Sequence, residues 1–558
     1  MHSKTINPPL KKEKIKYNQS LFLEFFILLA LLVFSHLLTD NMAENEVGKL
    51  MLAKQFISTD WLPNDWYLSQ PQSYQAFFQL IFGKSILAWG FLATSIIGRI
   101  VYYSLISSSL ILIARQIKLQ FLPLLIAITL FLYSQQGIVV AGEWMIGSLE
   151  TKGFSYGLVL IAIWLSMKKR YIWTIASLGL ATSLHILVGG YATLTFLMWA
   201  GWLGYKNNYF QKYFSKEHFS IIALSLFIYL VTSIFATFTL AHSLSQTVSV
   251  PDSELQATYI YTFLRNSHHL NPFVWQKIRF FIVAIYLSCL YWCWKKTKQE
   301  VAQDSHLSIQ SQSSAVNRLQ LLELTCFSLV PFFCGFAIAF FDSQGVFLQY
   351  YPFRFGSLML ALNVLLISAY LIQDFFQKSK CFEFLRNKGF LVCLIFLATI
   401  HTFTLTTFTK DLVSLSKFPI GVEKNNEKSQ DIFDWIQQNT EQDAVIISPP
   451  GRYVGFNWLT NRATIAKFKL VPPTETKILE WYARLNDLSG HPPSYIWPEM
   501  GFKMAAELDK GYSNLTTSQV IALMEKYDSQ YFFDSREHKL NLPIAYENDS
   551  YRLYRAES

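Results

Sequence analysis

Several ionisable residues stand where an apolar run of the sequence gives way to a polar one. Asp40 follows the first apolar run, Glu44 comes four positions later, and Asp65 lies in the same acidic and aromatic stretch. A carboxylate at such an edge is partly desolvated, which suits a general base or a metal ligand. An ordinary helix end that reaches water would also explain a lone Asp. The length of the segment 40–93 favours a functional loop, because long loops in compact proteins tend to be functional.

Two further polar interruptions carry ionisable groups. Glu150 and Lys152 precede an apolar run, and His185 lies deep inside another. Glu150 and Lys152 are either a charge pair that lines a cavity or a carboxylate that stabilises a helix N-terminus. His185 is either a functional group, the default interpretation at membrane depth, or a neutral imidazole hydrogen-bonded to a neighbouring helix.

Basic and imidazole side chains recur later in the chain. Arg265, His268 and His269 share one loop beside an Asn-Pro pair, and Arg354 begins an apolar run. These residue types suit recognition of an anionic phosphate or of sugar hydroxyls, although the loop could also simply cap a helical bundle. Arg354 needs an anionic partner, either a protein carboxylate or a lipid phosphate.

The C-terminal part adds a basic and aromatic belt that includes Arg462 and Arg484. Sugar stacking would use such residues, and so would a docking face for lipid head groups. Cys289 and Cys293 share a helix face, but no His is nearby, so packing is favoured over metal binding. We assign no metal ligands, and the need for a divalent metal as cofactor stays open.

A membrane bundle must position these residues. The chain has 558 residues, of which 52% are hydrophobic and 15% charged. Soluble domains carry about 25% charged residues, so the composition excludes a soluble multidomain enzyme, a disordered chain and a disulfide-stapled secreted scaffold. About 20 apolar residues cross the hydrocarbon core. Eleven candidate spans follow from this length: 20–39, 94–114, 120–141, 153–167, 171–190, 191–205, 218–240, 276–294, 321–341, 355–373 and 389–409.

The distribution of Lys and Arg predicts the orientation. The N-terminus and alternate loops hold 21 basic residues, against six in the opposite loops, which favours an N-in, C-out bundle. The formal net charge of +9 is then a topology signal, and no nucleic acid partner is needed. We predict a cytoplasmic basic tail (1–19), a transmembrane domain (20–409) with long outer loops at 40–93 and 241–275, and an extracytoplasmic domain (410–558).

The C-terminal segment has the pattern of a small α/β domain. Helical spacing is seen at 431–436, 474–488 and 516–527, the last opened by a Thr-Ser cap signal. Apolar runs at 444–448, 531–533 and 551–554 are typical of strands. The fold class is therefore mainly α, a polytopic bundle with a small C-terminal α/β domain. Two glycines, Gly189 and Gly190, predict the turn between the two spans within 171–205.

The architecture and several local strings resemble the GT-C superfamily of polytopic glycosyltransferases, and in particular an uncharacterised bacterial membrane-protein family of that type. The strings are Glu150-Thr-Lys-Gly-Phe-Ser-Tyr, Leu184-His-Ile-Leu-Val-Gly189, Arg265-Asn-Ser-His-His269, Pro352-Phe-Arg354, and Asn461-Arg462 with Glu480-Trp-Tyr-Ala-Arg484. The first-loop carboxylate signature of such enzymes is often a close acidic pair, whereas here Asp40 stands alone with Glu44 four positions on.

The resemblance implies a mechanism, in which Asp40 acts as general base on an acceptor hydroxyl. That hydroxyl would attack a sugar carried on a polyprenyl-phosphate lipid, with inversion. Arg265, His269 and Arg354 would neutralise the phosphate leaving group, while Glu150 and Lys152 would orient substrate. The expected location is the bilayer of a bacterial inner membrane. Two alternatives are a non-catalytic assembly or sensing protein of the same architecture, and a transporter of a lipid-linked substrate.

Overall fold

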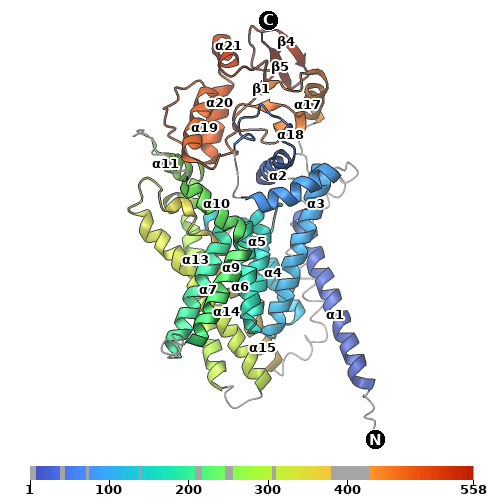
Figure 1. The fold of residues 1–558 in the computed structure, drawn as a ribbon, viewed down its shortest axis with the longest axis vertical. Helices are drawn as coiled ribbons and strands as arrows, with labels where there is room; N and C mark the ends of the chain where they lie inside the picture. Colours follow the sequence, from blue (N-terminus) through green and yellow to red (C-terminus); the bar gives the residue numbers. More distant parts are fainter. Residues whose placement is uncertain are drawn as a thin grey trace.

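A helical bundle carries a smaller domain of helices and strands on one end, and the start of the first helix lies at the other end (Figure 1). The computed structural model describes residues 8–37, 44–70, 75–137, 140–207, 216–245, 255–303, 309–378 and 427–556. The long helices of the bundle are α1 (Pro8–Leu32), α2 (Glu44–Ile57), α3 (Ala76–Gln116), α4 (Phe121–Gly137), α5 (Thr151–Met167), α6 (Tyr171–Leu184), α7 (Ile186–Lys206), α9 (Lys216–Thr232), α10 (Ile234–Ser245), α13 (Lys277–Gln303), α14 (Ile309–Ala339) and α15 (Arg354–Lys378).

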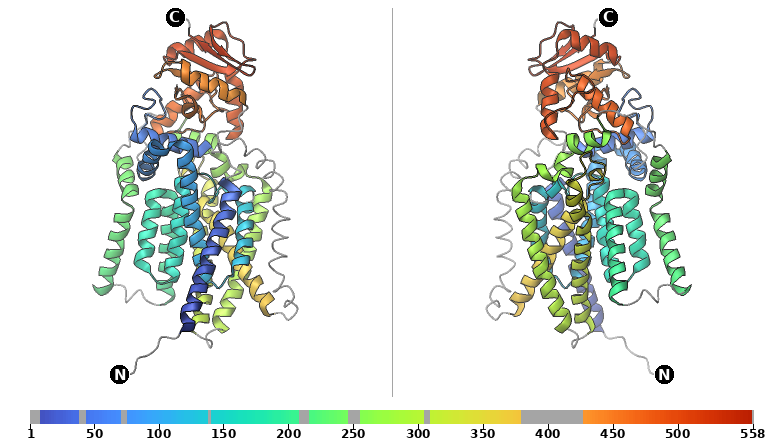
Figure 2. Two further views of the ribbon diagram at one scale, coloured as in Figure 1. Left: turned by 90° about the vertical axis from the view of Figure 1, so that its right-hand side faces the viewer. Right: turned by 90° about the vertical axis from the view of Figure 1, so that its left-hand side faces the viewer.

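Short helical turns fill the loops between these helices. They are η1 (Val33–Leu37), η3 (Val140–Gly142), α11 (Ala257–Tyr259), η4 (Ile260–Arg265), α12 (Ser267–Leu270), η5 (Pro272–Val274) and η7 (Leu348–Tyr350). Except for η1, which continues α1, these turns contact one another, and η4 packs against helices of the C-terminal domain, which sits on one end of the bundle (Figure 2). Two of them, η4 and α12, hold the loop residues that the sequence singles out.

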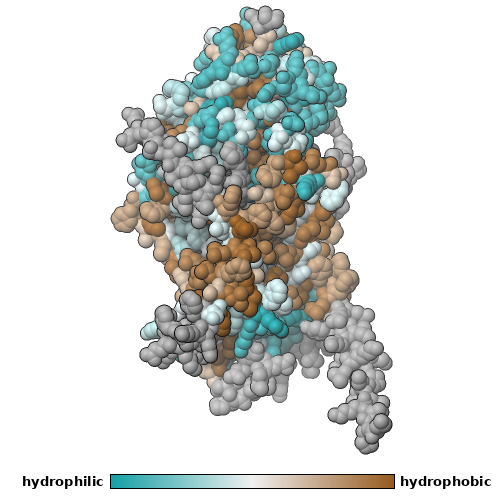
Figure 3. All heavy atoms as spheres, in the orientation of Figure 1, coloured by the Kyte–Doolittle hydropathy of each residue, from teal (hydrophilic) through white to brown (hydrophobic). Residues whose placement is uncertain are grey.

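Several helices have the length and composition of membrane spans. Within the described ranges, the helices that are long and apolar enough to cross a bilayer number five, namely α3, α7, α13, α14 and α15. Shorter apolar helices accompany them, and hydrophobic residues cover the middle of the bundle while hydrophilic ones cover most of the C-terminal domain (Figure 3). The chain is therefore a mainly helical, multi-pass bundle with a small sheet-containing domain, as the sequence predicts.

Ten of the eleven predicted spans coincide with described helices, and the eleventh, 389–409, lies outside the described residues. The break between α6 and α7 differs from the prediction, because it falls at His185 instead of Gly189-Gly190. His185 is extended (φ −148°, ψ 103°), and its side chain accepts a hydrogen bond from the Val188 backbone N–H. A side-chain cap at the start of α7 thus fixes the turn, while both glycines stay helical.

The segment 76–93, which falls within the predicted outer loop 40–93, is helical and belongs to α3. Gly90 breaks this helix with φ +80°, a conformation that glycine adopts at little cost. The part of α3 before Gly90 lies across the end of the bundle, and the part after it descends through the bundle (Figure 1).

The C-terminal domain is a five-stranded sheet between two layers of helices. Its elements are α17 (Glu427–Asn439), β1 (Val445–Ile447), α18 (Phe456–Thr460), β2 (Ala463–Thr464), α19 (Glu475–Asp487), α20 (Phe502–Tyr512), α21 (Thr517–Lys526), β3 (Tyr531–Ser535), β4 (Ile544–Glu547) and β5 (Tyr551–Arg555). The strand order is β2-β1-β3-β5-β4, with β1 parallel to β2 and β3 and the other two pairings antiparallel.

Alternating side chains of the strands build the two cores of this domain. Ile447 and Phe532 pack with α19, α20 and α21, whereas Ile446, Tyr531 and Phe533 pack with α17 and α18. This period of two is the strand pattern that the sequence shows. The predicted helices and strands of the segment are confirmed, including the capping box of Thr516 and Gln519 at α21.

Polar contacts join the C-terminal domain to the bundle. The buried Asp65 carboxylate, in the loop after α2, accepts hydrogen bonds from the Thr464 backbone N–H at 2.9 Å and from the Asn457 amide. On the other side of the junction, the Arg265 Nε donates to the Phe468 carbonyl at 2.8 Å, and the Gly501 N–H donates to the Leu264 carbonyl at 2.7 Å.

Candidate functional site

A cavity of about 530 Å³ lies where the bundle meets the C-terminal domain. Its wall is assembled from α2, the start of α5, the break between α6 and α7, the loop elements η4, α12 and η7, the start of α15, and the segment after β2. No single stretch of sequence contains the site, since the lining runs from Asn45 to Ile478.

Most of the residues singled out from the sequence line this one cavity. They are Glu150, Lys152, His185, Arg265, His268, His269 and Arg354. The structure shows that these side chains are neighbours, and their roles toward a substrate stay predictions.

Glu143 is the centre of the charged network behind the cavity. Its carboxylate is fully buried and lies 2.7 Å from the Arg354 Nε, 3.8 Å from the Lys152 Nζ and 3.7 Å from the His269 Nδ1. Lys152 also lies 3.8 Å from the Glu150 carboxylate. Burying a charge is costly unless it is paired, so Glu143 holds Arg354 and Lys152 in place at the cavity wall.

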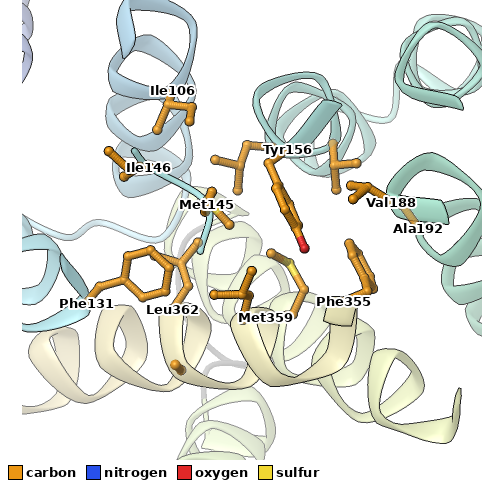
Figure 4. Packing of buried hydrophobic residues seen from close by; sticks show 14 of the residues in the cluster. Ile106, Phe131, Met145, Ile146, Tyr156, Val188, Ala192, Phe355, Met359 and Leu362 are labelled. Atoms are coloured by element: carbon orange, nitrogen blue, oxygen red, sulfur yellow. The ribbon is translucent and has the colours of Figure 1, made fainter. Parts of the chain in front are cut away.

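The loop that carries Glu143 is rigidly packed. Met145 and Ile146 are fully buried between α3, α4 and α15 (Figure 4). The side chain of Gln135 bonds both of their backbone N–H groups, at 3.0 and 3.2 Å, and the Tyr103 hydroxyl donates to the Gly147 carbonyl at 2.6 Å. These hydrogen bonds and the buried side chains fix the backbone that carries the Glu143 carboxylate.

Arg354 is the most constrained cation of the site. It begins α15, its guanidinium lies 3.8 Å from the centre of the Tyr351 ring, and one of its nitrogens is 3.4 Å from the His185 Nε2. Tyr351 has left-handed backbone angles (φ +55°), a strained conformation for a residue other than glycine. Aromatic stacking and the Glu143 carboxylate together fix the guanidinium plane.

His269 is held in one tautomer. Its Nδ1 lies 2.5 Å from the Ala141 carbonyl oxygen, which can only accept, so Nδ1 carries the proton and Nε2 carries the lone pair. Burial and the positive charges of Arg354 and Lys152 hold the pKa of His269 well below its usual range. The imidazole is therefore neutral near pH 7 and offers an acceptor nitrogen rather than a positive charge.

The helix α2 supplies one side of the cavity through Asn45, Gly48 and Lys49. A buried ion pair between Glu46 and Arg99 ties α2 to α3. Gly48 faces Leu470 of the C-terminal domain so closely that a Cβ would come within 2.8 Å of the leucine side chain. This contact explains why glycine suits the position.

The remaining predicted residues are placed elsewhere. Asp40 lies outside the described residues, and of Glu44 the structure gives only the backbone, at the first position of α2. Asp65 sits in the junction described above, where burial raises the pKa of its carboxyl against the opposing effect of its hydrogen bonds. Their catalytic and substrate-binding roles stay predictions.

Two arginines of the C-terminal domain also lie outside the cavity lining. The buried Arg462 donates to the backbone carbonyls of Gln437 and Thr440 at 3.0 and 2.7 Å. Arg484 pairs with Glu480 at 2.9 Å and stacks on Trp66. These contacts stabilise the domain, and the predicted binding role of both arginines is untested.

Sequence reasoning missed Glu143 and Lys49 as site residues, whereas Lys469 belongs to the basic and aromatic belt that the sequence shows in the C-terminal part. Glu143 stands only seven positions before Glu150 in the same polar stretch. This proximity to a predicted site residue could have identified it. Lys469 lies in the C-terminal domain, and nothing in the sequence shows that it lines the same cavity as Arg265. In the part of the chain that the structure describes, no group of three His, Cys, Asp or Glu residues could hold a metal ion.

Comparisons with known proteins add little beyond this geometry. Residues 427–488 match a family model described as a domain of unknown function (DUF6798), and no curated protein matches the chain. Among solved structures, the chain is similar to the oligosaccharyltransferase of Archaeoglobus fulgidus, tethered with an acceptor peptide, at a TM-score of 0.42 and 11% identity, covering 92% of this chain and 69% of that one. Similarity at this level does not assign a function, which has to be argued from the site.

Proposed function

We propose that this chain is a membrane glycosyltransferase that moves a sugar from a polyprenyl-phosphate donor to an acceptor at the bundle end that carries the C-terminal domain. The observation that carries the proposal is the cavity at this end, lined by Arg354 and Lys152 over the buried Glu143. A cavity of about 530 Å³ falls within the range of small-molecule sites. Cations at the bundle end suit a phosphate whose lipid tail stays in the bilayer.

The proposed chemistry forms one bond and breaks another. The acceptor hydroxyl attacks the anomeric carbon, and the bond between that carbon and the phosphate oxygen breaks with its electron pair going to the phosphate. Arg354 and Lys152 stabilise the negative charge that develops on this leaving group. Because both are already fixed by carboxylates, they need little reorganisation during the reaction.

The proton of the acceptor hydroxyl needs a base, and Asp40 is the residue proposed from the sequence. Asp40 precedes α2, whose residues Asn45 and Lys49 line the cavity. The resemblance to glycosyltransferases implies that His269 neutralises the phosphate leaving group, but we assign it a different role. Its Nε2 is a hydrogen-bond acceptor, so we assign it to a hydroxyl of sugar or acceptor rather than to the phosphate. Arg265 lines the cavity beside the C-terminal domain and adds positive charge.

The test is transfer of labelled sugar from polyprenyl-phosphate donors by purified protein in lipid nanodiscs. Arg354→Gln is expected to lower transfer by at least about 100-fold, the effect typical of removing one group that stabilises developing charge. Asp40→Asn should abolish transfer but keep donor binding. Lys477→Gln, an exposed lysine of the C-terminal domain, serves as the control and should change neither.

Other outcomes would favour the other classes of protein. Donor binding without transfer to any acceptor would support a non-catalytic assembly or sensing protein. Movement of the intact lipid-linked donor between the two leaflets would support a transporter. Full activity in Asp40→Asn would show that another group is the base.

A further inference from the structure

Two loops beside the cavity expose large apolar side chains. One loop contains η5 and leads into α13, and the other joins α14 to α15 through η7. Their exposed side chains, which we name the aromatic ledge, are Phe273, Val274, Phe340, Phe341, Phe347 and Tyr350. The rings of Phe273 and Phe340 join the two loops, with 5.3 Å between their centres. Apolar surface exposed in this way marks a place that meets a partner or a membrane.

Polar contacts fix the backbone under the ledge. The buried Asp342 carboxylate accepts hydrogen bonds from the three successive backbone N–H groups of residues 346–348, each at 2.8 Å. The side chain of Asn271 accepts one from the Phe273 N–H at 3.0 Å. The ledge is therefore a defined surface of two ordered loops.

The ledge continues the exposed apolar surface of neighbouring membrane spans. The two loops connect α13, α14 and α15, which all have the length and composition to cross a bilayer. The structure describes every residue of α13, and of these 27 only Leu290, Cys293 and Thr297 are buried. The first two turns of α13 expose Ile278 and Phe281. An apolar surface that runs from a span into the loops at its end matches hydrocarbon along the span and the interface beyond it.

Two cations at the start of α13 suit the same surroundings. Lys277 and Arg279 are the first and third residues of this helix, and Lys277 is exposed. Long basic side chains beside apolar surface keep their stems on the hydrocarbon and their charges among the lipid phosphates. The charge at this end of α13 is therefore complementary to a lipid head-group layer.

We propose that the aromatic ledge inserts into the bilayer interface on the side that carries the C-terminal domain, and that it holds the cavity at the level of the lipid head groups. The bilayer is the partner because the ledge is continuous with the exposed apolar surface of α13. Tyr350 belongs to the ledge and also lines the cavity beside Gln349. A lipid of this leaflet then reaches the cavity without crossing water. The inference does not depend on sugar transfer.

A fluorescent amino acid at position 341, where the native Phe is 87% exposed, tests the insertion. The full-length protein is placed in nanodiscs whose lipids carry a nitroxide on the head group, and iodide serves as the quencher from water. The probe at 341 should lose most of its emission to the nitroxide and little to iodide. A matched probe at exposed Ile544 in β4, at the far end of the C-terminal domain, should show the reverse (Figure 1). Position 347 replaces 341 if the first labelled protein does not fold.

A photoreactive benzophenone amino acid at position 341 identifies what covers the ledge in native membranes. Irradiation should produce an adduct with phospholipid, detected by mass spectrometry of the purified protein. An adduct with a second copy of the chain or with another protein, formed in place of the lipid adduct, would overturn the bilayer as the partner. Equal quenching by iodide at 341 and 544 would overturn it as well.

Phe341→Ser separates the ledge from the ligand site. Farnesyl phosphate is a short polyprenyl phosphate, and its affinity for this variant should stay within about twofold of the unchanged protein, because Phe341 lies outside the cavity lining. A large loss of affinity would place the ledge in the ligand site and overturn its assignment to the bilayer. Absence of farnesyl phosphate binding by the unchanged protein would contradict the proposed function alone, since both probe experiments are read without that ligand.

Discussion

Two buried carboxylates at the junction of bundle and C-terminal domain have opposite surroundings. Glu143 faces Arg354, Lys152 and His269 at the cavity wall. In the hydrogen bonds that the structure describes for Asp65, every donor is neutral. The donors are the backbone N–H groups of Leu68 and Thr464 and the side chains of Asn457 and Thr464.

The comparison shows that burial alone does not mark a functional carboxylate. The sequence favours Asp65 as a binding residue and passes over Glu143, whereas the structure sets Glu143 behind the cavity and Asp65 in a clamp between two domains. A carboxylate that holds cations at a cavity keeps them ready for an anionic ligand. A carboxylate surrounded by amides and hydroxyls joins segments of chain.

The largest effect is expected from removing the Glu143 charge. Glu143→Gln leaves Arg354 and Lys152 buried without their shared carboxylate, which should lower the free energy of unfolding by about 3–5 kcal/mol. Thermal unfolding of the solubilised protein measures the loss. Glu150→Gln, which affects the 3.8 Å contact with Lys152 and a 3.4 Å hydrogen bond from the Ser148 hydroxyl, is the matched control and should cost much less. Equal losses would contradict the central place of Glu143.

Removing the Asp65 charge should have a smaller and different effect. In Asp65→Asn, an amide NH₂ faces the hydrogen-bond donors of Asn457 or Thr464, which should cost about 2 kcal/mol. Limited proteolysis should then release the C-terminal domain more readily, while farnesyl phosphate binding by the intact protein stays unchanged. Lost binding with unchanged proteolysis would instead assign Asp65 to the substrate site.

A third buried carboxylate, Asp534, gives the C-terminal domain a pH-dependent stability. His538 lies between Asp534, 2.7 Å from its Nδ1, and the Leu515 carbonyl, 2.8 Å from its Nε2, so both ring nitrogens face acceptors. The hydrogen bonds with Asp534 and Leu515 raise the pKa of His538 against the opposing effect of burial.

The folded state therefore holds the His538 proton more tightly than the unfolded state does. The stabilisation is fully present below the unfolded pKa of about 6.5 and is lost as pH rises through the higher folded pKa. Unfolding temperatures measured between pH 6 and 9 should fall with pH, and His538→Gln should flatten that dependence. An unchanged slope in the variant would assign the dependence to other groups.

The smallest effect is expected at Arg484. Arg484→Gln removes a helix ion pair with Glu480 and a stacking contact with Trp66, which together should cost less than about 1 kcal/mol. Since Arg484 lies outside the cavity lining, farnesyl phosphate affinity should match that of the unchanged protein, whereas Arg354→Gln should weaken it. A clear loss of affinity in Arg484→Gln would show that the ligand extends onto α19.

Much of the fold could be predicted from the length of the apolar runs and from the alternation of side chains in the strands. The apolar runs of the bundle coincide with helices because helix length at the membrane is set by hydrocarbon thickness. The predicted strands at 444–448 and 531–533 appear as β1 and β3 because their alternating side chains meet two separate cores. Four elements were missed, namely β2, α18, β4 and α20. The first three have only two to five residues, which give too little periodicity to read, whereas the eleven residues of α20 were overlooked.

The turn at His185 was misplaced for a physical reason. Glycine pairs are typical of turns, but Gly189 packs against the α6 backbone near Thr182, where any Cβ would collide. Gly189 therefore permits close helix packing, whereas the cap at the helix break comes from His185. A sequence alone does not distinguish a glycine needed for packing from one needed for a turn.

By itself, the sequence determined that the chain is a multi-pass helical protein with a small α/β domain, and it identified most of the ionisable residues that line the cavity. These properties depend on composition and local spacing. Only the tertiary structure decided that Glu143 pairs with Arg354, 211 positions away, and that Lys469 of the C-terminal domain lines the same cavity as Arg265. Such pairings follow from how distant segments pack, because the cost of leaving a charge buried and unpaired selects partners that local sequence does not specify.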